Sequence, residues 1–224
     1  MNIQEELNDL MEDNGVYANL RPAPADLITD FTGKLPDFLL ELWKQHGFGS
    51  WSNGLYHVCN PHDFGGLLSQ VFHADEDFSH KDCHVFGYSA FGGLHVWSEK
   101  YGIVDINLTR ATLRCINLID GKKTEDPSLE AVFSLSLHAD RKKSLNIYDD
   151  NDKPLFARAR KRLGDLEPGE CYGFFPALAM GGAPRLENLK RTKALEHFLF
   201  LAQLQQFTLM DYLSRPIRAV RMIG

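Results

Sequence analysis

The chain has 224 residues, of which 44% are hydrophobic, and this is enough for one large domain or two small ones that each bury a core. No stretch approaches the ~20 consecutive apolar residues of a membrane span, and the acidic N-terminus lacks the basic start and apolar run of a signal peptide. The four cysteines are scattered without a CxxC pair, so we expect free, buried thiols in a cytoplasmic protein.

Charge is distributed unevenly along the chain, whose formal net charge is -6. Residues 1–80 carry thirteen acidic and three basic side chains, whereas residues 141–224 carry fifteen basic and nine acidic ones. An acidic surface repels nucleic-acid phosphates and attracts basic proteins. The first third therefore favours a basic protein partner, although acids that only keep the surface solvated would give the same count.

Apolar residues at helical spacing predict four helices in the first third of the chain, over residues 3–11, 26–31, 35–46 and 61–72. Pro36 stands where a first helical position belongs, and Gly47 ends that helix. Asn53-Gly54 indicates a turn before a short strand at 55–59. An exposed acidic loop is expected at 74–77.

A run of β-branched and aromatic segments follows, at 83–88, 94–97, 102–107 and 112–118. Their spacing predicts an antiparallel meander. The polar stretch 120–127 is typical of a domain boundary. Beyond it we expect helices over 127–137, 155–163 and 190–204, a strand at 171–177, and a tail that does not continue the last helix because it contains Pro216.

The predicted fold class is therefore α+β: an antiparallel β-meander flanked by helices, in two closely packed domains. The first domain takes residues 1–120 and the second residues 121–224.

Six potential metal ligands lie close together in the sequence: His57, Cys59, His62, His80, Cys83 and His84. Cys59-x2-His62 and His80-x2-Cys83 have spacings typical of zinc sites. However, no Gly-rich zinc turn flanks either pair, and Cys59 ends a predicted strand. Core thiols beside surface histidines explain the pattern better, so we predict no metal site. A small metal-dependent enzyme that uses this cluster is the alternative.

The sequence contains no complete catalytic or nucleotide-binding motif. The stretch Gly87-Tyr88-Ser89-Ala90-Phe91 resembles a nucleophile elbow but has Phe91 where the last Gly is needed. The basic stretch 158–162 lacks the aromatic residues of a single-strand-binding surface, although a nucleic-acid-binding module on the 153–162 face is a further alternative. We predict no catalytic residue and no cofactor, which favours a binding protein over an enzyme.

Several motifs follow one another in a known order: Leu35-Pro36, Trp43, Gly47, Asn53-Gly54 and Asn60-Pro61. This order resembles the GAD-like domain of bacterial immunity proteins. The second half, through residues 169–174, 186–189 and 196–204, resembles the C-terminal domain that follows it in type VI secretion DNase-immunity proteins. The resemblance implies a cytoplasmic protein that binds and neutralises a cognate nuclease toxin in bacterial competition, with no catalytic residue.

Charge and resemblance together suggest a toxin-binding surface in the acidic N-terminal half. A DNase presents basic side chains to phosphates, and an acidic surface can occupy the same groove. The predicted contacts are acids and aromatic anchors: Asp9, Glu12, Asp13, Trp51, Tyr56, Asp75, Glu76 and Asp77. For Trp51, packing on the core beside Trp43 is the alternative. We expect no direct contact with nucleic acid and none with a membrane.

Overall fold

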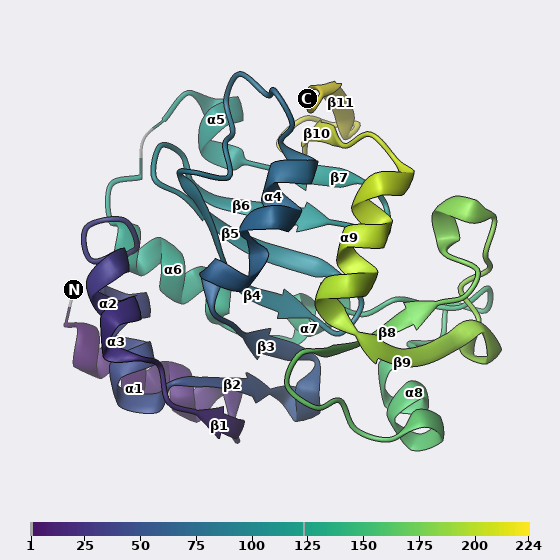
Figure 1. Ribbon diagram of the computed structural model, residues 1–224, viewed down its shortest axis with the longest axis horizontal. Helices are drawn as coiled ribbons and strands as arrows, with labels where there is room; N and C mark the ends of the chain where they lie inside the picture. Colours follow the sequence, from purple (N-terminus) through teal and green to yellow (C-terminus); the bar gives the residue numbers. More distant parts are fainter. Residues whose placement is uncertain (1, 123) are drawn as a thin grey trace.

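The computed structural model describes residues 2–122 and 124–224. Its centre is a nine-stranded sheet within these residues (Figure 1). In spatial order the strands are β1 (Ala18–Arg21), β2 (Phe48–Trp51), β3 (Tyr56–Val58), β4 (Cys83–Ser89), β5 (Gly93–Ser98), β6 (Gly102–Asn107), β7 (Thr112–Arg114), β10 (Thr208–Asp211) and β11 (Arg218–Met222).

Each strand from β1 to β7 pairs antiparallel with the next in sequence, which confirms the predicted meander. The sheet is longer than expected, because β10 returns from the end of the chain to pair with β7 in parallel, and β11 pairs antiparallel with β10. The strands β1 and β11 are therefore the two edges of this sheet.

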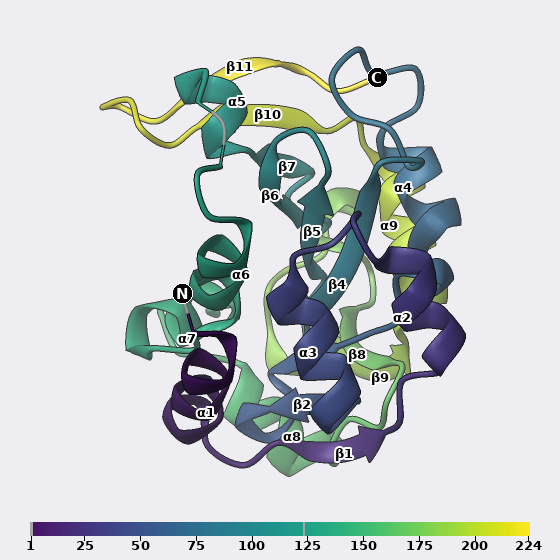
Figure 2. The ribbon, with the colours of Figure 1, turned by 90° about the vertical axis from the view of Figure 1, so that its left-hand side faces the viewer.

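Helices cover both faces of the sheet. On one face lie α4 (Gly65–Val71) and α9 (Ala194–Leu204), and α1 (Ile3–Asn14), α3 (Asp37–His46) and α6 (Pro127–Leu135) lie on the other (Figures 1 and 2). The remaining helices are α2 (Ala25–Phe31), α5 (Ile116–Asp120), α7 (Ala139–Ser144) and α8 (Phe156–Leu163). A separate hairpin pairs β8 (Glu170–Phe174) with β9 (Leu189–Lys193).

The two faces give two hydrophobic cores. Every residue of β4 is buried, and its side chains reach both cores, as expected for a strand covered on both sides, with a register shift between Val85 and Gly87. Val85 packs with α4 and α9, whereas Phe86 packs with α1, α3 and α6. No helix in the described residues is long and apolar enough to cross a membrane.

Each core contains residues from both halves of the chain. Leu7 and Phe174 belong to one core, and Phe64 and Phe207 belong to the other. The division into two domains at residue 120 stays a prediction, whereas the two halves of the chain share both cores. The physical reason is that β10 completes its hydrogen bonding on β7, a strand of the first half.

The helix α3 shows how local sequence sets an element. Pro36 precedes it, and Gly47 ends it with a φ of 69°, where the Gly47 N–H donates to the Trp43 carbonyl oxygen. Gly47 also lies against the backbone of Arg21, and a Cβ there would collide with the Arg21 carbonyl oxygen. Glycine is therefore required both to end the helix and to let β1 approach.

Two predicted elements are corrected. The segment 112–118 is not one strand, because β7 ends at Arg114 and α5 follows it. The segment 190–204 is not one helix, because residues 190–193 belong to β9 and pair with β8. In both cases the spacing of apolar residues within the short segment gave the wrong element, because contacts with neighbouring elements decide its structure.

Candidate functional site

The first helix is held tightly on its apolar side. Leu7 and Leu10 are buried where α1 packs on α3 and α6. Asn14, also buried, donates a hydrogen bond to the Leu135 carbonyl oxygen at 3.0 Å and accepts one from the Leu137 N–H at 2.7 Å. The orientation of α1 is therefore fixed by contacts with the second half of the chain.

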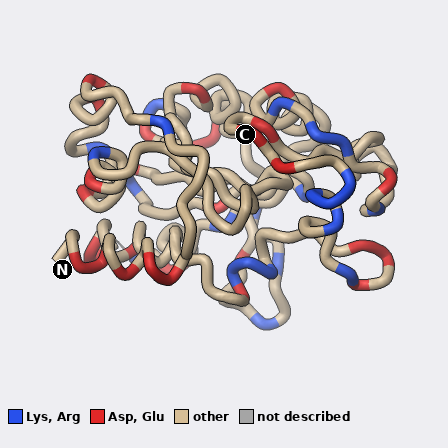
Figure 3. The backbone as a smooth tube through the Cα atoms, turned by 90° about the horizontal axis from the view of Figure 1, so that it is seen from below, with Lys and Arg blue, Asp and Glu red and all other residues tan. Residues whose placement is uncertain are grey.

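The opposite face of α1 is acidic and exposed. Four acids on this face are exposed: Glu5, Asp9, Glu12 and Asp13. They lie on the side of the helix opposite the buried Leu7 and Leu10. Figure 3 shows acidic residues, in red, along the helix beside the N-terminus. Within residues 2–122 and 124–224 none of the four carboxylates forms an ion pair. We call this surface the α1 acidic face.

Trp51 and Tyr56 lie elsewhere: both side chains are 0% exposed. The indole of Trp51 packs on the ring of Tyr17, with ring centroids 4.3 Å apart, and Tyr56 fits against Gly87 of β4. Both residues are buried because 48–51 forms β2, a strand that the sequence analysis did not predict and whose four residues are all buried. The expectation of exposed aromatic anchors is therefore corrected.

The acidic loop at 75–77 is also not the free surface that was expected. Asp75 accepts hydrogen bonds from Arg221 at 2.6 and 3.0 Å and from the Gly224 N–H at 3.1 Å, and its side chain is only 1% exposed. Asp77 accepts bonds from Tyr101 at 2.6 Å and from Arg221 at 2.7 Å. Glu76 is the exposed acid of this loop, at 80%, and its carboxylate lies 3.9 Å from the same Arg221 guanidinium.

Two exposed apolar residues lie beside α1, where the buried Trp51 and Tyr56 cannot serve as contacts. Val16, directly after the helix, is 83% exposed, and Leu20 on the edge strand β1 is 58% exposed. Exposed apolar side chains next to a charged rim are typical of interaction surfaces. The sequence predicts no helix or strand between residues 11 and 26, so its pattern did not point to these two residues.

The six potential metal ligands are dispersed. His57 stacks on Tyr88 with ring centroids 4.8 Å apart, and Cys59 and Cys83 are buried. His62 pairs with Asp30 at 3.5 Å, and His84 with Glu99 at 2.7 Å. In the part of the chain that the structure describes, no group of three or more His, Cys, Asp or Glu side chains is placed to hold a metal ion.

The basic stretch 158–162 is partly neutralised. Arg158 pairs with Asp149 at 2.5 Å, and Arg160 pairs with Asp165 at 2.8 Å. These pairs lower the charge that the α8 surface offers to phosphates.

A buried polar cluster joins the sheet to α6 and α7. The His95 Nε2 lies 3.3 Å from Arg141 and 3.7 Å from Asp105, and its Nδ1 lies 3.5 Å from the Ser134 hydroxyl. Burial, followed by the charge of Arg141, lowers the pKa of His95 to about 3, so the imidazole is neutral at pH 7. The serine–histidine separation exceeds the ~2.6–3.2 Å of an activated nucleophile, and both side chains are buried. The cluster connects the sheet to α6 and α7, and its His95, Asp105 and Arg141 also line a smaller pocket of about 200 Å³.

Comparisons with known proteins agree with this architecture. Residues 5–110 match the model of the GAD-like domain, and residues 134–205 match the model described as T6SS immunity protein Tdi1, C-terminal. The crystal structure of Atu4351 from Agrobacterium tumefaciens is similar over 96% of each chain, with 26% sequence identity and a TM-score of 0.90. No curated protein matches the chain.

Proposed function

Because the chain carries a GAD-like domain followed by the C-terminal domain of the T6SS immunity protein Tdi1, we propose that it binds and neutralises a cognate nuclease toxin. An immunity role in type VI secretion comes from the second domain. The finer proposal is that the toxin is a DNase and that this protein acts by covering the toxin's DNA-binding surface, without catalysis of its own. The place of action that fits this proposal is the cytoplasm, where the DNA lies.

The observation that carries the proposal is the α1 acidic face. Four exposed carboxylates lie on one helix surface and pair with no cation among residues 2–122 and 124–224, so we expect their charge to be available to a partner. A DNA-binding surface is basic, and complementary charge accelerates association and excludes the phosphates that would compete. Helix α1 is rigidly held through Asn14, so the carboxylates keep their arrangement before binding.

Val16 and Leu20 add the second part of the interface. Rim acids mainly raise the association rate, whereas apolar contacts excluded from water slow dissociation. Both residues lie at the end of α1 and on the free edge of the sheet. The proposed interface therefore consists of the α1 acidic face, Val16 and the β1 edge.

The test uses the nuclease encoded beside this gene, purified with the full-length protein. The variant Asp9→Lys/Glu12→Lys/Asp13→Lys is compared with a control that reverses three other exposed acids, Glu125, Glu167 and Glu187. Both variants change the net charge equally. We expect the α1 variant alone to lose inhibition of plasmid cleavage and the salt dependence of binding. Equal inhibition by the two variants would remove the α1 acidic face from the interface.

A further inference from the structure

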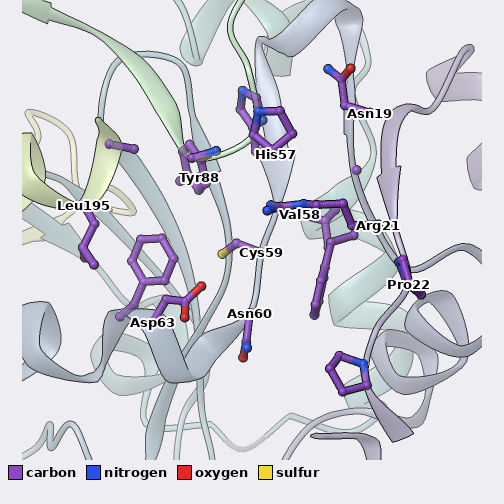
Figure 4. A pocket seen from close by; sticks show the side chains of 17 residues that line it. Asn19, Arg21, Pro22, His57, Val58, Cys59, Asn60, Asp63, Tyr88 and Leu195 are labelled. Carbon is purple, nitrogen blue, oxygen red and sulfur yellow. The ribbon is translucent and has the colours of Figure 1, made fainter. Parts of the chain in front are cut away.

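A cleft of about 610 Å³ opens beside β1, separate from the α1 acidic face (Figure 4). Its floor is apolar and comes from both halves of the chain, with Val58, Phe64, Tyr88 and Leu195 among the lining residues. The volume lies within the ~300–1,000 Å³ range of small-molecule sites. Few of the lining residues are charged, so the position of each charge indicates which ligands the cleft can bind.

Arg21 enters this cleft from β1. The strand is irregular there: Asn19 has a φ of 57°, and the pairing register with β2 shifts between Ala18 and Arg21. Bulges on edge strands re-aim side chains and often occur at binding sites. Asn19 and Arg21 both line the cleft, and Arg21 forms no ion pair with any described residue.

Asp63 supplies the opposite charge. It belongs to the 3-10 turn η2 (Pro61–Phe64), whose start is fixed because the Asn60 side chain accepts a hydrogen bond from the His62 N–H at 3.0 Å. Asp63 is exposed, lines the same cleft and pairs with no described cation, Arg21 included. The cleft therefore holds a positive and a negative group that do not neutralise each other.

The buried thiol of Cys59 lies between the two charges in the close view (Figure 4). Burial raises the pKa of Cys59 well above its usual value, Asp63 raises it further, and Arg21 lowers it. Both charged groups of the cleft therefore influence the pKa of the same thiol. The thiol itself stays neutral at pH 7 and adds no charge.

His57 is the other titratable lining residue that matters for the charge balance. Burial lowers the pKa of His57 to about 4, so its ring is neutral at pH 7. The ring stacks on Tyr88 with an interplanar angle of 8° and extends the flat wall of the cleft. At neutral pH the charged groups of the lining are therefore Arg21 and Asp63, set above aromatic and aliphatic side chains.

We propose that this cleft binds a small zwitterion with an apolar body, namely an α-amino acid with an aromatic or large aliphatic side chain. Its carboxylate binds the Arg21 guanidinium, its ammonium group binds the Asp63 carboxylate, and its side chain packs on Tyr88 and Phe64. An acid or an amine alone satisfies one charge and leaves the other unpaired, so the cleft selects molecules that carry both. This inference does not depend on toxin binding.

The test is a binding titration, by NMR or calorimetry, of the full chain with four probes of matched size. L-phenylalanine carries both charges, 3-phenylpropionate only the acid, phenethylamine only the amine, and 2-phenylethanol neither. We expect L-phenylalanine to bind about tenfold more tightly than either single-charge probe, because one further charged hydrogen-bonded pair forms. Equal binding of all four probes, or none by L-phenylalanine, would overturn the proposal.

Two substitutions assign the charges. Arg21→Gln is expected to weaken L-phenylalanine and 3-phenylpropionate while leaving phenethylamine unchanged, and Asp63→Asn to weaken L-phenylalanine and phenethylamine only. Arg110→Gln, at an exposed arginine outside the cleft, is the matched control and should change none of them. Both replaced residues are exposed, so thermal melting should show that the variants remain folded. If both substitutions weaken every probe equally, the charges do not select the ligand.

Discussion

The Asp75 carboxylate and the Arg221 guanidinium lie 146 residues apart in the chain and are joined by two hydrogen bonds, of 2.6 and 3.0 Å. Arg221 is on the edge strand β11, and Asp75 lies in the loop after α4. The pair therefore ties the end of the chain to the N-terminal half. The Gly224 N–H adds a third bond to the same carboxylate.

Replacing Asp75 by Asn should lower the free energy of unfolding by about 2 kcal/mol, because it removes the charge of the buried carboxylate and weakens its hydrogen bonds with Arg221, which keeps its pairs with Asp77 and Glu76. The neighbouring substitution Glu76→Gln is the control, since Glu76 is 80% exposed, and it should change stability by less than about 0.5 kcal/mol. Urea unfolding of both variants measures the difference. Equal effects would mean that the pair contributes nothing to stability.

The same carboxylate predicts a pH dependence. Burial alone would raise the pKa of Asp75, but hydrogen bonds from Arg221 and from three backbone N–H groups lower it to about 2. The folded-state pKa is thus below the unfolded one, so the stabilisation is complete above about pH 4 and is lost as the pH falls toward 2. The stability difference between the wild-type chain and Asp75→Asn should shrink over that window. A constant difference between pH 5 and pH 2.5 would contradict the assignment.

Much of the fold was predictable because the longer helices and strands have clear patterns of apolar residues and clear end signals in the sequence. Pro36 and Gly47 mark the ends of α3, and the glycine-separated apolar segments 83–107 gave the meander. The strands β1, β2, β10 and β11 were missed because each has only four or five residues and exists through pairing with a distant segment.

The candidate site was predictable only in part, for the same reason. Asp9, Glu12 and Asp13 were found because helical spacing alone separates them from Leu7 and Leu10. The burial of Trp51 depends on the unpredicted strand β2. The burial of Asp75 depends on Arg221, and no pattern within residues 74–77 reveals a partner so distant in sequence.

Trp51→Ala should lower the free energy of unfolding by about 3–5 kcal/mol, because it opens a cavity next to Tyr17 in the core. Trp51→Phe should lower it by less, since the ring contact is partly kept. Chemical unfolding gives both values. If Trp51 were instead an exposed contact, the alanine variant would lose toxin affinity while its unfolding midpoint stayed unchanged.

Asp105 should be more important for stability than either arginine that it binds. Among the described residues it is the one carboxylate that pairs with both Arg114 and Arg141. Asp105→Asn leaves two cations unpaired and should cost about 3 kcal/mol, whereas Arg141→Met leaves the Arg114 pair intact and should cost about 1 kcal/mol. Unfolding of the single and double variants tests this order. An equal loss from both single variants would show that the carboxylate does not connect the two arginines energetically.

The two parts of the proposed interface should separate in binding kinetics. Val16→Thr/Leu20→Thr removes apolar surface and places threonine, which strands accommodate well, at two exposed positions, so stability should change by less than about 0.5 kcal/mol. Toxin dissociation should become about tenfold faster, with little change in the association rate.

Reversal of Asp9, Glu12 and Asp13 should instead slow association. This loss should become smaller at high salt, because screening already removes the attraction. Surface plasmon resonance at two salt concentrations measures both rates. If the Val16/Leu20 variant slows association and leaves dissociation unchanged, these residues do not form the desolvated part of the contact.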